Sequence, residues 1–261
     1  VSYFPAVPTI FSMIVNHPSV MAGDLDLTSI KACISGSAPL GRDTQEKFER
    51  FTGGYLVEGY GLSEAPTATH CNPILGEKRT GSIGLPLPDV DCRVIDIQTH
   101  GEVAIGEPGE LLIRGPQVMI GYHNQKDETD LVLRDGWLHT GDVVRMDSDG
   151  YFYVVGRIKD LIKVHGLQVW PVEVENIIAA MPGVVECAVA GVPDPKTGER
   201  VKVWIVKDKD TQISLEGIQA FCYGKLADFK IPREYEECAS LPRSAVGKIL
   251  RRELIRRQSL I

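Results

Sequence analysis

The apolar positions of the first 65 residues alternate between helical and strand spacing. Between Pro8 and Pro18 they recur at helical spacing, which predicts a helix that Pro18 ends. SIKACIS (29–35) predicts a short buried strand, RDTQEKFERF (42–51) a polar helix, and YLVEGYGLSE (55–64) a strand that breaks into a glycine-bearing loop. Strand, turn, helix and strand in this order predict a parallel α/β layer, in which ligands bind at the carboxyl ends of the strands.

From about Thr80 the pattern changes to short β-rich runs separated by Gly and Pro turns, at the spacing of a barrel or sandwich. These runs are DCRVID (91–96), GELLIRG (109–115) and YFYVVGR (151–157). After Gly156 the pattern becomes mixed. WPVEVENIIAAMPG (170–183) predicts a helix with a proline in its first turn, VVECAVAGV and RVKVWIVK predict strands, and Ser214 is expected to cap a further helix.

We therefore expect two domains. Residues 1–156 form the first, with an α/β layer to about residue 80 and a β-rich subdomain over about 81–156. Residues 157–261 form a small α+β domain.

Composition narrows the class of protein. The 261 residues carry a net charge of −7, which argues against nucleic acid as a main partner because phosphate binding needs a basic face. The six cysteines and six histidines are scattered, with no CxxC pair and no HExxH, so neither a zinc site nor a disulfide framework is indicated. A reducing, cytoplasmic location is favoured. No apolar run is long enough to span a membrane, and peripheral membrane contact of the basic C-terminal run stays open.

The first residues, VSYFPAVPTIFSMIVNHP, have no initiator Met, no charged region and no small-residue cleavage site. They do not match a signal peptide and resemble the middle of a domain, so we expect the chain to be a fragment.

Near the other end, LPRSAVGKILRREL (241–254) places Lys248 directly after a glycine. A P-loop would need a glycine where Pro242 stands and a Ser or Thr where Ile249 stands, so that interpretation fails. The basic residues here are Lys248, Arg251, Arg252, Arg256 and Arg257. For all except Lys248 a solvated helix face is the favoured interpretation.

Three further segments carry candidate chemistry. In EGYGLSE (58–64), Glu64 could hold Mg²⁺, which prefers one or two carboxylates together with phosphates and water, while Ser63 could reach a phosphate and Tyr60 a base. In WLHTGD, Asp142 could accept both hydroxyls of a ribose, and Arg157 in GRIKDLIKVHG could bind ribose or phosphate oxygens. The alternatives are a strand-to-loop turn with a chance acid, an ordinary Gly-Asp turn and a surface ion pair.

Together, six motifs in order resemble the core motifs of the adenylate-forming acyl-CoA synthetases over essentially the whole chain. They are GSAPL, YGLSE, GELLIRGPQVMIGY, WLHTGD, GRIKDLIKVHGLQVWPVEVE and LPRSAVGKILRREL. Within the superfamily, the stretches GSIGLPLPDVDCRVID, GPQVMIGY, DGWLHTGD and VGKILRREL look most like bacterial long-chain fatty acid–CoA ligases. The alternatives are a medium-chain or aryl acid–CoA ligase, transfer to a carrier-protein thiol, or a non-catalytic nucleotide-binding module.

The resemblance implies a fold, a reaction and a set of residues. The fold would be the α/β layer and β-barrel remnant of a large domain, followed by a small mobile C-terminal domain. A carboxylic acid, for example a fatty acid, would react with MgATP to give an acyl-adenylate, and coenzyme A would then take the acyl group. Lys248 would be the catalytic lysine and Glu64 the Mg²⁺ ligand. The nucleotide would be bound by Gly36, Ser37, Ala38, Pro39, Glu58, Gly59, Tyr60, Gly61, Ser63, Asp142 and Arg157. The hinge would be Lys159 and Asp160, and coenzyme A would pass His165, Gly166 and Leu167.

The sequence departs from the family pattern at several positions. Ser63 stands where Thr is common, and Leu167 and Trp170 differ from the aromatic residues expected near GLQVWP. The phosphate loop that the family carries upstream of GSAPL is missing, so we expect no turnover from this chain alone. Gly166 is expected to be glycine because a backbone must pass close to a thin ligand arm.

Overall fold

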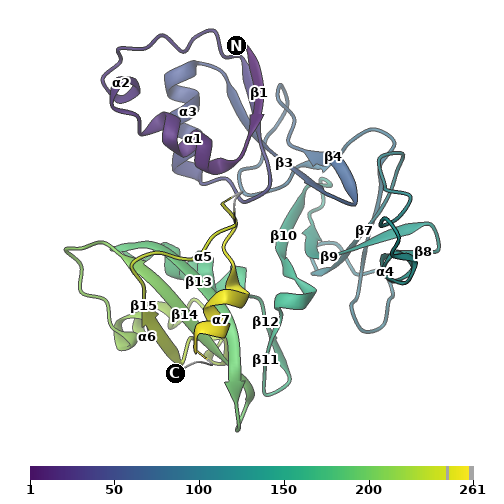
Figure 1. Ribbon diagram of the computed structural model, residues 1–261, viewed down its shortest axis with the longest axis vertical. Helices are drawn as coiled ribbons and strands as arrows, with labels where there is room; N and C mark the ends of the chain where they lie inside the picture. The colour runs from purple at the N-terminus through teal and green to yellow at the C-terminus, as the bar shows by residue number, and fades with distance from the viewer. Residues whose placement is uncertain (245–246, 259–261) are drawn as a thin grey trace. The chain divides into compact units, whose positions relative to one another are not determined.

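The computed structural model describes residues 1–244 and 247–258. The chain divides into two compact units, Val1–Val154 and Val155–Ile261, each with hydrophobic clusters of its own (Figure 1). No helix among the described residues is both long enough and apolar enough to cross a membrane.

The N-terminal sheet of the first unit is parallel in its first half and antiparallel in its second. Its strands lie in the order β1-β2-β3-β4-β5, with the bounds Tyr3–Ala6, Ala32–Ser35, Tyr55–Leu62, Ala65–Cys71 and Leu85–Pro86. β1, β2 and β3 pair in parallel, whereas β4 pairs antiparallel with both β3 and β5. The predicted parallel α/β layer is therefore confirmed.

Three helices accompany this sheet (Figure 1): α1 (Pro8–Val15), α2 (Pro18–Met21) and α3 (Arg42–Thr52). The rings of Phe11 and Phe48 join α1 to α3, with their centroids 5.1 Å apart in an edge-to-face arrangement. Both side chains are fully buried, so these aromatic rings form the centre of the N-terminal core.

The prediction that YLVEGYGLSE breaks into a glycine-bearing loop is wrong for most of this segment. β3 continues to Leu62, because Gly59 and Tyr60 pair with Cys71 and His70 of β4, and the chain turns only at 63–64. Backbone pairing with a strand further along the chain overrides the loop tendency of the two glycines.

The rest of the first unit is β-rich, as predicted. A second sheet has the order β10-β9-β7-β6, with β8 beside β9. The bounds are β6 Asp91–Ile95, β7 Gly109–Arg114, β8 Leu133–Arg134, β9 Trp137–Met146 and β10 Phe152–Arg157, with helix α4 at Lys126–Val132. β7 pairs antiparallel with β6 and β9.

The second unit is a small α+β body around a sheet of order β12-β11-β14-β13, with β15 parallel to β14. Its strands are β11 Ile162–Val164, β12 Leu167–Val169, β13 Val184–Asp194, β14 Gly198–Lys207 and β15 Glu234–Glu237. Its helices are α5 Pro171–Ala179, α6 Leu215–Cys222 and α7 Arg251–Gln258, with short 3₁₀ turns η1 Ile158–Asp160 and η2 Asp228–Lys230. Ser214 caps α6 as predicted, since its hydroxyl accepts a 3.1 Å hydrogen bond from the Gly217 N–H.

Candidate functional site

Two predicted nucleotide-binding segments lie side by side in the first unit. β2 and β3 are parallel neighbours, and Ser35 at the end of β2 pairs with Glu58. The turn that follows β2 begins at Gly36, and its next residues, 37–39, are exposed. The GSAP turn and the EGYG segment therefore meet at the carboxyl end of β2, where ligands bind in open α/β sheets.

Tyr60 links the first sheet to the predicted ribose carboxylate. Its hydroxyl donates a 2.6 Å hydrogen bond to Asp142 Oδ2, although the two residues are 82 positions apart. Asp142 is only 6% exposed, so a charge-assisted hydrogen bond of this length fixes its carboxylate strongly. The structure thus joins two candidate residues that come from separate motifs, EGYGLSE and WLHTGD.

Asp142 does not follow an ordinary turn, as one interpretation of WLHTGD held. It lies inside β9, at an irregularity where residues 140–142 oppose Leu111 alone. Gly141 has a φ of +66°, and the Thr140 hydroxyl donates to Leu111 O at 2.7 Å and accepts from the Asp142 N–H at 3.1 Å. A bulge of this kind re-aims a side chain within a strand.

Glu64, the predicted metal ligand, is held by the GPQVMIGY segment, for which the sequence predicted no contact. The Tyr122 hydroxyl donates a 2.6 Å hydrogen bond to Glu64 Oε1, and the Met119 N–H donates to Glu64 O at 2.7 Å. The carboxylate raises the pKa of Tyr122 to about 12 because it stabilises the protonated phenol. GPQVMIGY contributes to the family resemblance, and its tyrosine is the residue that could have indicated a contact with Glu64.

The single carboxylate of Glu64 suits Mg²⁺ better than a metal ion that needs three or more protein ligands. Among the described residues, no three His, Cys, Asp or Glu side chains cluster as a metal site. Mg²⁺ is usually bound through one or two carboxylates, substrate phosphates and water, so a single positioned carboxylate is sufficient.

Glu58 is a half-buried carboxyl beside the GSAP turn. Burial raises its pKa to about 7, and a hydrogen bond from the backbone of Leu40 opposes this shift. Ser63, the predicted phosphate contact, is exposed at the β3–β4 turn. Glu58 therefore changes charge near neutral pH, at the edge of the predicted nucleotide site.

Lys248 lies shortly before α7, and its backbone pairs with that of Ser244. The Ser244 N–H donates to Lys248 O at 2.8 Å, the Lys248 N–H donates to the Ser244 hydroxyl at 3.2 Å, and the Gly247 N–H donates to Ser244 O at 2.9 Å. Gly247 has a φ of +80°, so the glycine before Lys248 serves a left-handed turn. The Lys248 side chain is exposed, and its approach to Glu64 stays a prediction.

The turn geometry gives Gly166 a local reason to be glycine, and close approach to a ligand arm stays a prediction. His165 and Gly166 form the two-residue turn between β11 and β12, with φ values of +51° and +80°, as in a type I′ hairpin. Apart from Gly166 and its two chain neighbours, no heavy atom of the described residues lies within 4 Å of the position that a Cβ would take, so the positive φ of the turn is what favours glycine within the chain itself. His165 and Leu167 are exposed, so the proposed coenzyme A contacts occupy an accessible hairpin tip.

The other predicted residues of the second unit lie where the chain enters it, on the end of β10 and on η1. Arg157 ends β10 and is half-buried, while Lys159 is exposed on η1. The solvated-face interpretation of the basic run is wrong for Arg251, whose side chain is 23% exposed and forms an ion pair with Glu175. It agrees with the exposure of Arg252 and Arg256, and the side chain of Arg257 lies outside the described part of the chain.

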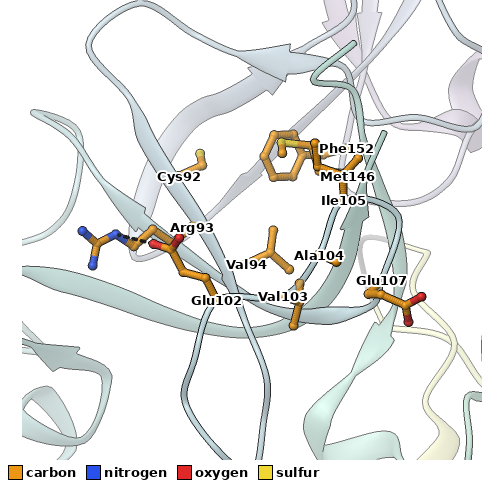
Figure 2. A pocket seen from close by; sticks show the side chains of 10 residues that line it. All are labelled: Cys92, Arg93, Val94, Glu102, Val103, Ala104, Ile105, Glu107, Met146 and Phe152. Atoms are coloured by element: carbon orange, nitrogen blue, oxygen red, sulfur yellow. Dashed lines mark ion pairs between the residues drawn. The ribbon is translucent and has the colours of Figure 1, made fainter. Parts of the chain in front are cut away.

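A cavity of about 150 Å³ opens elsewhere in the first unit, between Arg93, Glu102, Val94 and Phe152 (Figure 2). Near it, Cys92 Sγ lies 3.4 Å from Nε2 of His70. Burial lowers the pKa of His70 to about 3 and raises that of Cys92 to about 12, so the pair is a neutral imidazole and a thiol. None of the predicted site residues lines this cavity.

Comparisons with known proteins find relatives that match nearly the whole chain. The chain is 46% identical over 256 residues to a long-chain-fatty-acid–CoA ligase of Bacillus subtilis (strain 168), covering 98% of this chain and 45% of that protein. It is 39% identical to a feruloyl-CoA synthase of Amycolatopsis sp, covering 96% and 50%. The ATP-bound crystal structure of MatB from Rhodopseudomonas palustris matches with a TM-score of 0.90 at 34% identity, covering 98% and 51%.

The chain thus spans about half the length of the curated relatives it matches. Two family models account for most of it. Residues 1–123 match the model described as AMP-binding enzyme, and residues 173–248 match the AMP-binding enzyme C-terminal domain. The chain belongs to the AMP-binding enzyme family.

Proposed function

We propose that the chain is part of an AMP-forming acid–thiol ligase that joins a long-chain fatty acid to coenzyme A. One observation carries the proposal. Two carboxylates of the first unit, Glu64 and Asp142, are each held by a tyrosine hydroxyl, at 2.6 Å in both cases. One carboxylate suits a metal bound to phosphates and the other a ribose, which together describe a site for MgATP.

The reaction has two steps. An oxygen of the fatty acid carboxylate bonds to the α-phosphorus of ATP, and the bond from that phosphorus to the bridging oxygen breaks and releases pyrophosphate. The thiol of coenzyme A then loses its proton, its sulfur bonds to the acyl carbon, and AMP leaves with the acyl oxygen. The Lys248 ammonium stabilises the charge that accumulates in the first step, as a preorganised cation does. Mg²⁺ at Glu64 would supply further neutralisation of the phosphate oxygens.

Each remaining residue has a place in this scheme. Residues 36–39 and the Tyr60 ring border the adenine, Ser63 contacts phosphate, and Asp142 and Arg157 bind the ribose. The second unit is a mobile domain that turns about Lys159 and Asp160. After the turn, the exposed hairpin tip at 165–167 borders the pantetheine arm. A lysine on an exposed turn supports this division, because it can be withdrawn without opening a core.

The long-chain substrate is supported by the 46% identity to the Bacillus subtilis ligase, against 39% to the feruloyl-CoA synthase. An aryl acid is the second candidate because of that synthase. Fatty and aryl acids need acyl sites of different shape. The proposed site residues contact the nucleotide and the thiol, so they do not distinguish the two acids.

The test is ATP–pyrophosphate exchange by the gene product that contains this chain, at its full natural length. We expect exchange with a C16 fatty acid to exceed exchange with a C8 acid and with ferulic acid by at least about tenfold in kcat/KM. Exchange that is greatest with ferulic acid would replace the long-chain proposal with the aryl one. No exchange with any acid, together with intact ATP binding, would favour a non-catalytic nucleotide-binding module.

A further inference from the structure

Residues 242–244 and 248–250 pair antiparallel as the two stems of a hairpin, and Lys248 lies on the second stem. The Leu250 N–H donates to Pro242 O at 2.8 Å, and Arg243 and Ile249 form an antiparallel bridge. On one stem, Arg243 forms an ion pair with Glu186 of β13, where its side chain is 42% exposed. The other stem leads directly into α7, whose first residue is Arg251.

Arg251 has a more enclosed setting than Arg243. Its Nη2 donates to both oxygens of Glu175 at 2.7 Å, and its Nε lies 3.2 Å from Glu175 Oε1. Glu175 is only 15% exposed and also accepts a 2.7 Å hydrogen bond from the Val189 N–H, so α5 and β13 hold it in place. A guanidinium that makes several hydrogen bonds to one carboxylate is fixed in direction as well as in position.

The same guanidinium faces the hinge segment. Its Nη1 lies 4.0 Å from Oδ2 of Asp160 on η1. One cation therefore stands between a carboxylate of α5 and a carboxylate of the proposed hinge, three residues after Lys248.

α7 has a second, independent attachment. Leu254 is 2% exposed and belongs to a hydrophobic cluster with Trp204 and Leu241. Because this apolar contact holds the helix, loss of the Arg251 contacts is expected to loosen the start of α7 and the hairpin more than the fold of the unit.

We propose that Arg251 is a positioning residue for the adenylation step: held by Glu175 and facing Asp160, it fixes the hairpin that presents Lys248. The inference rests on the proposed role of Lys248. Misplacement of a reacting group by about 1 Å can cost about 10²-fold in rate, so a positioning residue outside the reacting atoms can have a large effect.

The test separates two half-reactions of the full-length gene product. Adenylation is measured as acid-dependent ATP–pyrophosphate exchange, and thioester formation is measured from supplied acyl-adenylate and coenzyme A. We expect Arg251→Met to lower adenylation about 10- to 100-fold and to leave thioester formation within about twofold. Glu175→Gln should act in the same direction, and Arg251→Lys, which keeps the charge without the planar fork, should restore part of the rate. Arg252→Met, at the exposed neighbour on the same helix, should change neither half-reaction.

Several results would overturn the inference. Unchanged adenylation in Arg251→Met would do so, and so would an equal loss of both half-reactions together with a lower Tm, which indicates a purely structural role. If Arg251→Met does not fold, Arg251→Lys and Glu175→Gln decide by the same split between half-reactions. If Lys248→Ala keeps full adenylation, the proposed role of Lys248 fails and the inference with it, whereas absence of exchange in the wild type is what overturns the proposed function. If Lys248→Ala loses adenylation and Arg251→Met does not, the inference alone fails.

Discussion

Two candidate carboxylates of the first unit and two candidate residues of the second lie in contrasting surroundings. In the first unit, Asp142 is 6% exposed and Glu64 is half-buried, and each accepts a hydrogen bond from a tyrosine. In the second unit, Lys248 and His165 are exposed on turns. The first unit thus holds these two carboxylates in a partly enclosed setting, where the lower dielectric strengthens their hydrogen bonds, while the two side chains of the second unit stay in solvent, as the proposed mobile domain requires.

The largest expected effect concerns the exposed lysine. Lys248→Ala should lower acid-dependent ATP–pyrophosphate exchange about 10²–10³-fold, because one preorganised charge contact is lost at the reacting phosphate. Thioester formation from supplied acyl-adenylate should change little, and the Tm should fall by at most a few degrees because surface substitutions usually cost little stability. Lys209→Ala, at another exposed lysine of this unit, is the control and should behave as the wild type. A similar loss in both half-reactions would contradict the contrast between the units.

The next effect compares a glycine from each unit. Gly84 and Gly166 both have positive φ, but a Cβ on Gly84 would lie 2.1 Å from the backbone carbon of Cys71, whereas Gly166 faces open space. We expect Gly84→Ala to lower the free energy of unfolding by about 3 kcal/mol or more through forced backbone shifts. Gly166→Ala should cost about 1 kcal/mol from the left-handed conformation alone. Urea unfolding followed by fluorescence measures both, and equal losses would show that the packing at Gly84 relaxes.

A third prediction tests the burial of charge in the first unit. The folded state raises the pKa of Glu58 from 4.5 to about 7, so it favours the protonated form. Its contribution to stability is present below pH 4.5 and is lost as the pH rises to about 7. Relative to the wild type, Glu58→Gln should therefore gain on the order of 2 kcal/mol in unfolding free energy between pH 4.5 and pH 8. A difference that does not vary with pH, measured by denaturant unfolding, would contradict the buried setting of Glu58.

The smallest expected effect concerns the tyrosine on Glu64. Tyr122→Phe removes the 2.6 Å hydrogen bond that orients the carboxylate, so the Mg²⁺ concentration for half-maximal exchange should rise about tenfold. Direct titration of the ATP-bound protein with Mn²⁺, followed by electron paramagnetic resonance, gives a second readout. Tyr153→Phe removes a comparable 3.1 Å hydrogen bond to Asp147 and serves as the control. An unchanged metal requirement would show that Tyr122 does not position Glu64 for the ion.

Local pattern was sufficient for much of the fold. The helix of 42–51, the strands of the second unit and the Ser214 cap follow from spacing and capping chemistry, which act over a few residues. The extent of β3 could not be predicted, because its partner β4 supplies the pairing that overrides its glycines.

The site was predicted as single residues and not as pairs. Tyr60 and Asp142 were both proposed, but their contact spans 82 residues and depends on sheet order and on the bulge in β9. Tyr122 was missed for the same reason, since it reaches Glu64 across 58 residues. Arg251 was assigned to a solvated face because helical spacing does not reveal that Glu175 lies opposite it.

The bulge in β9 also helps to decide which homologues keep the hydrogen bond between the tyrosine and the aspartate. Side chains alternate between the two faces of a strand, so removal of Gly141 would shift the register on one side of the deletion and turn those side chains to the other face. Such a homologue would keep an aspartate that aligns with Asp142 and still lose its hydrogen bond to the tyrosine. The spacing between His139 and Val143 is therefore a more informative marker of the Tyr60–Asp142 contact than the presence of the aspartate.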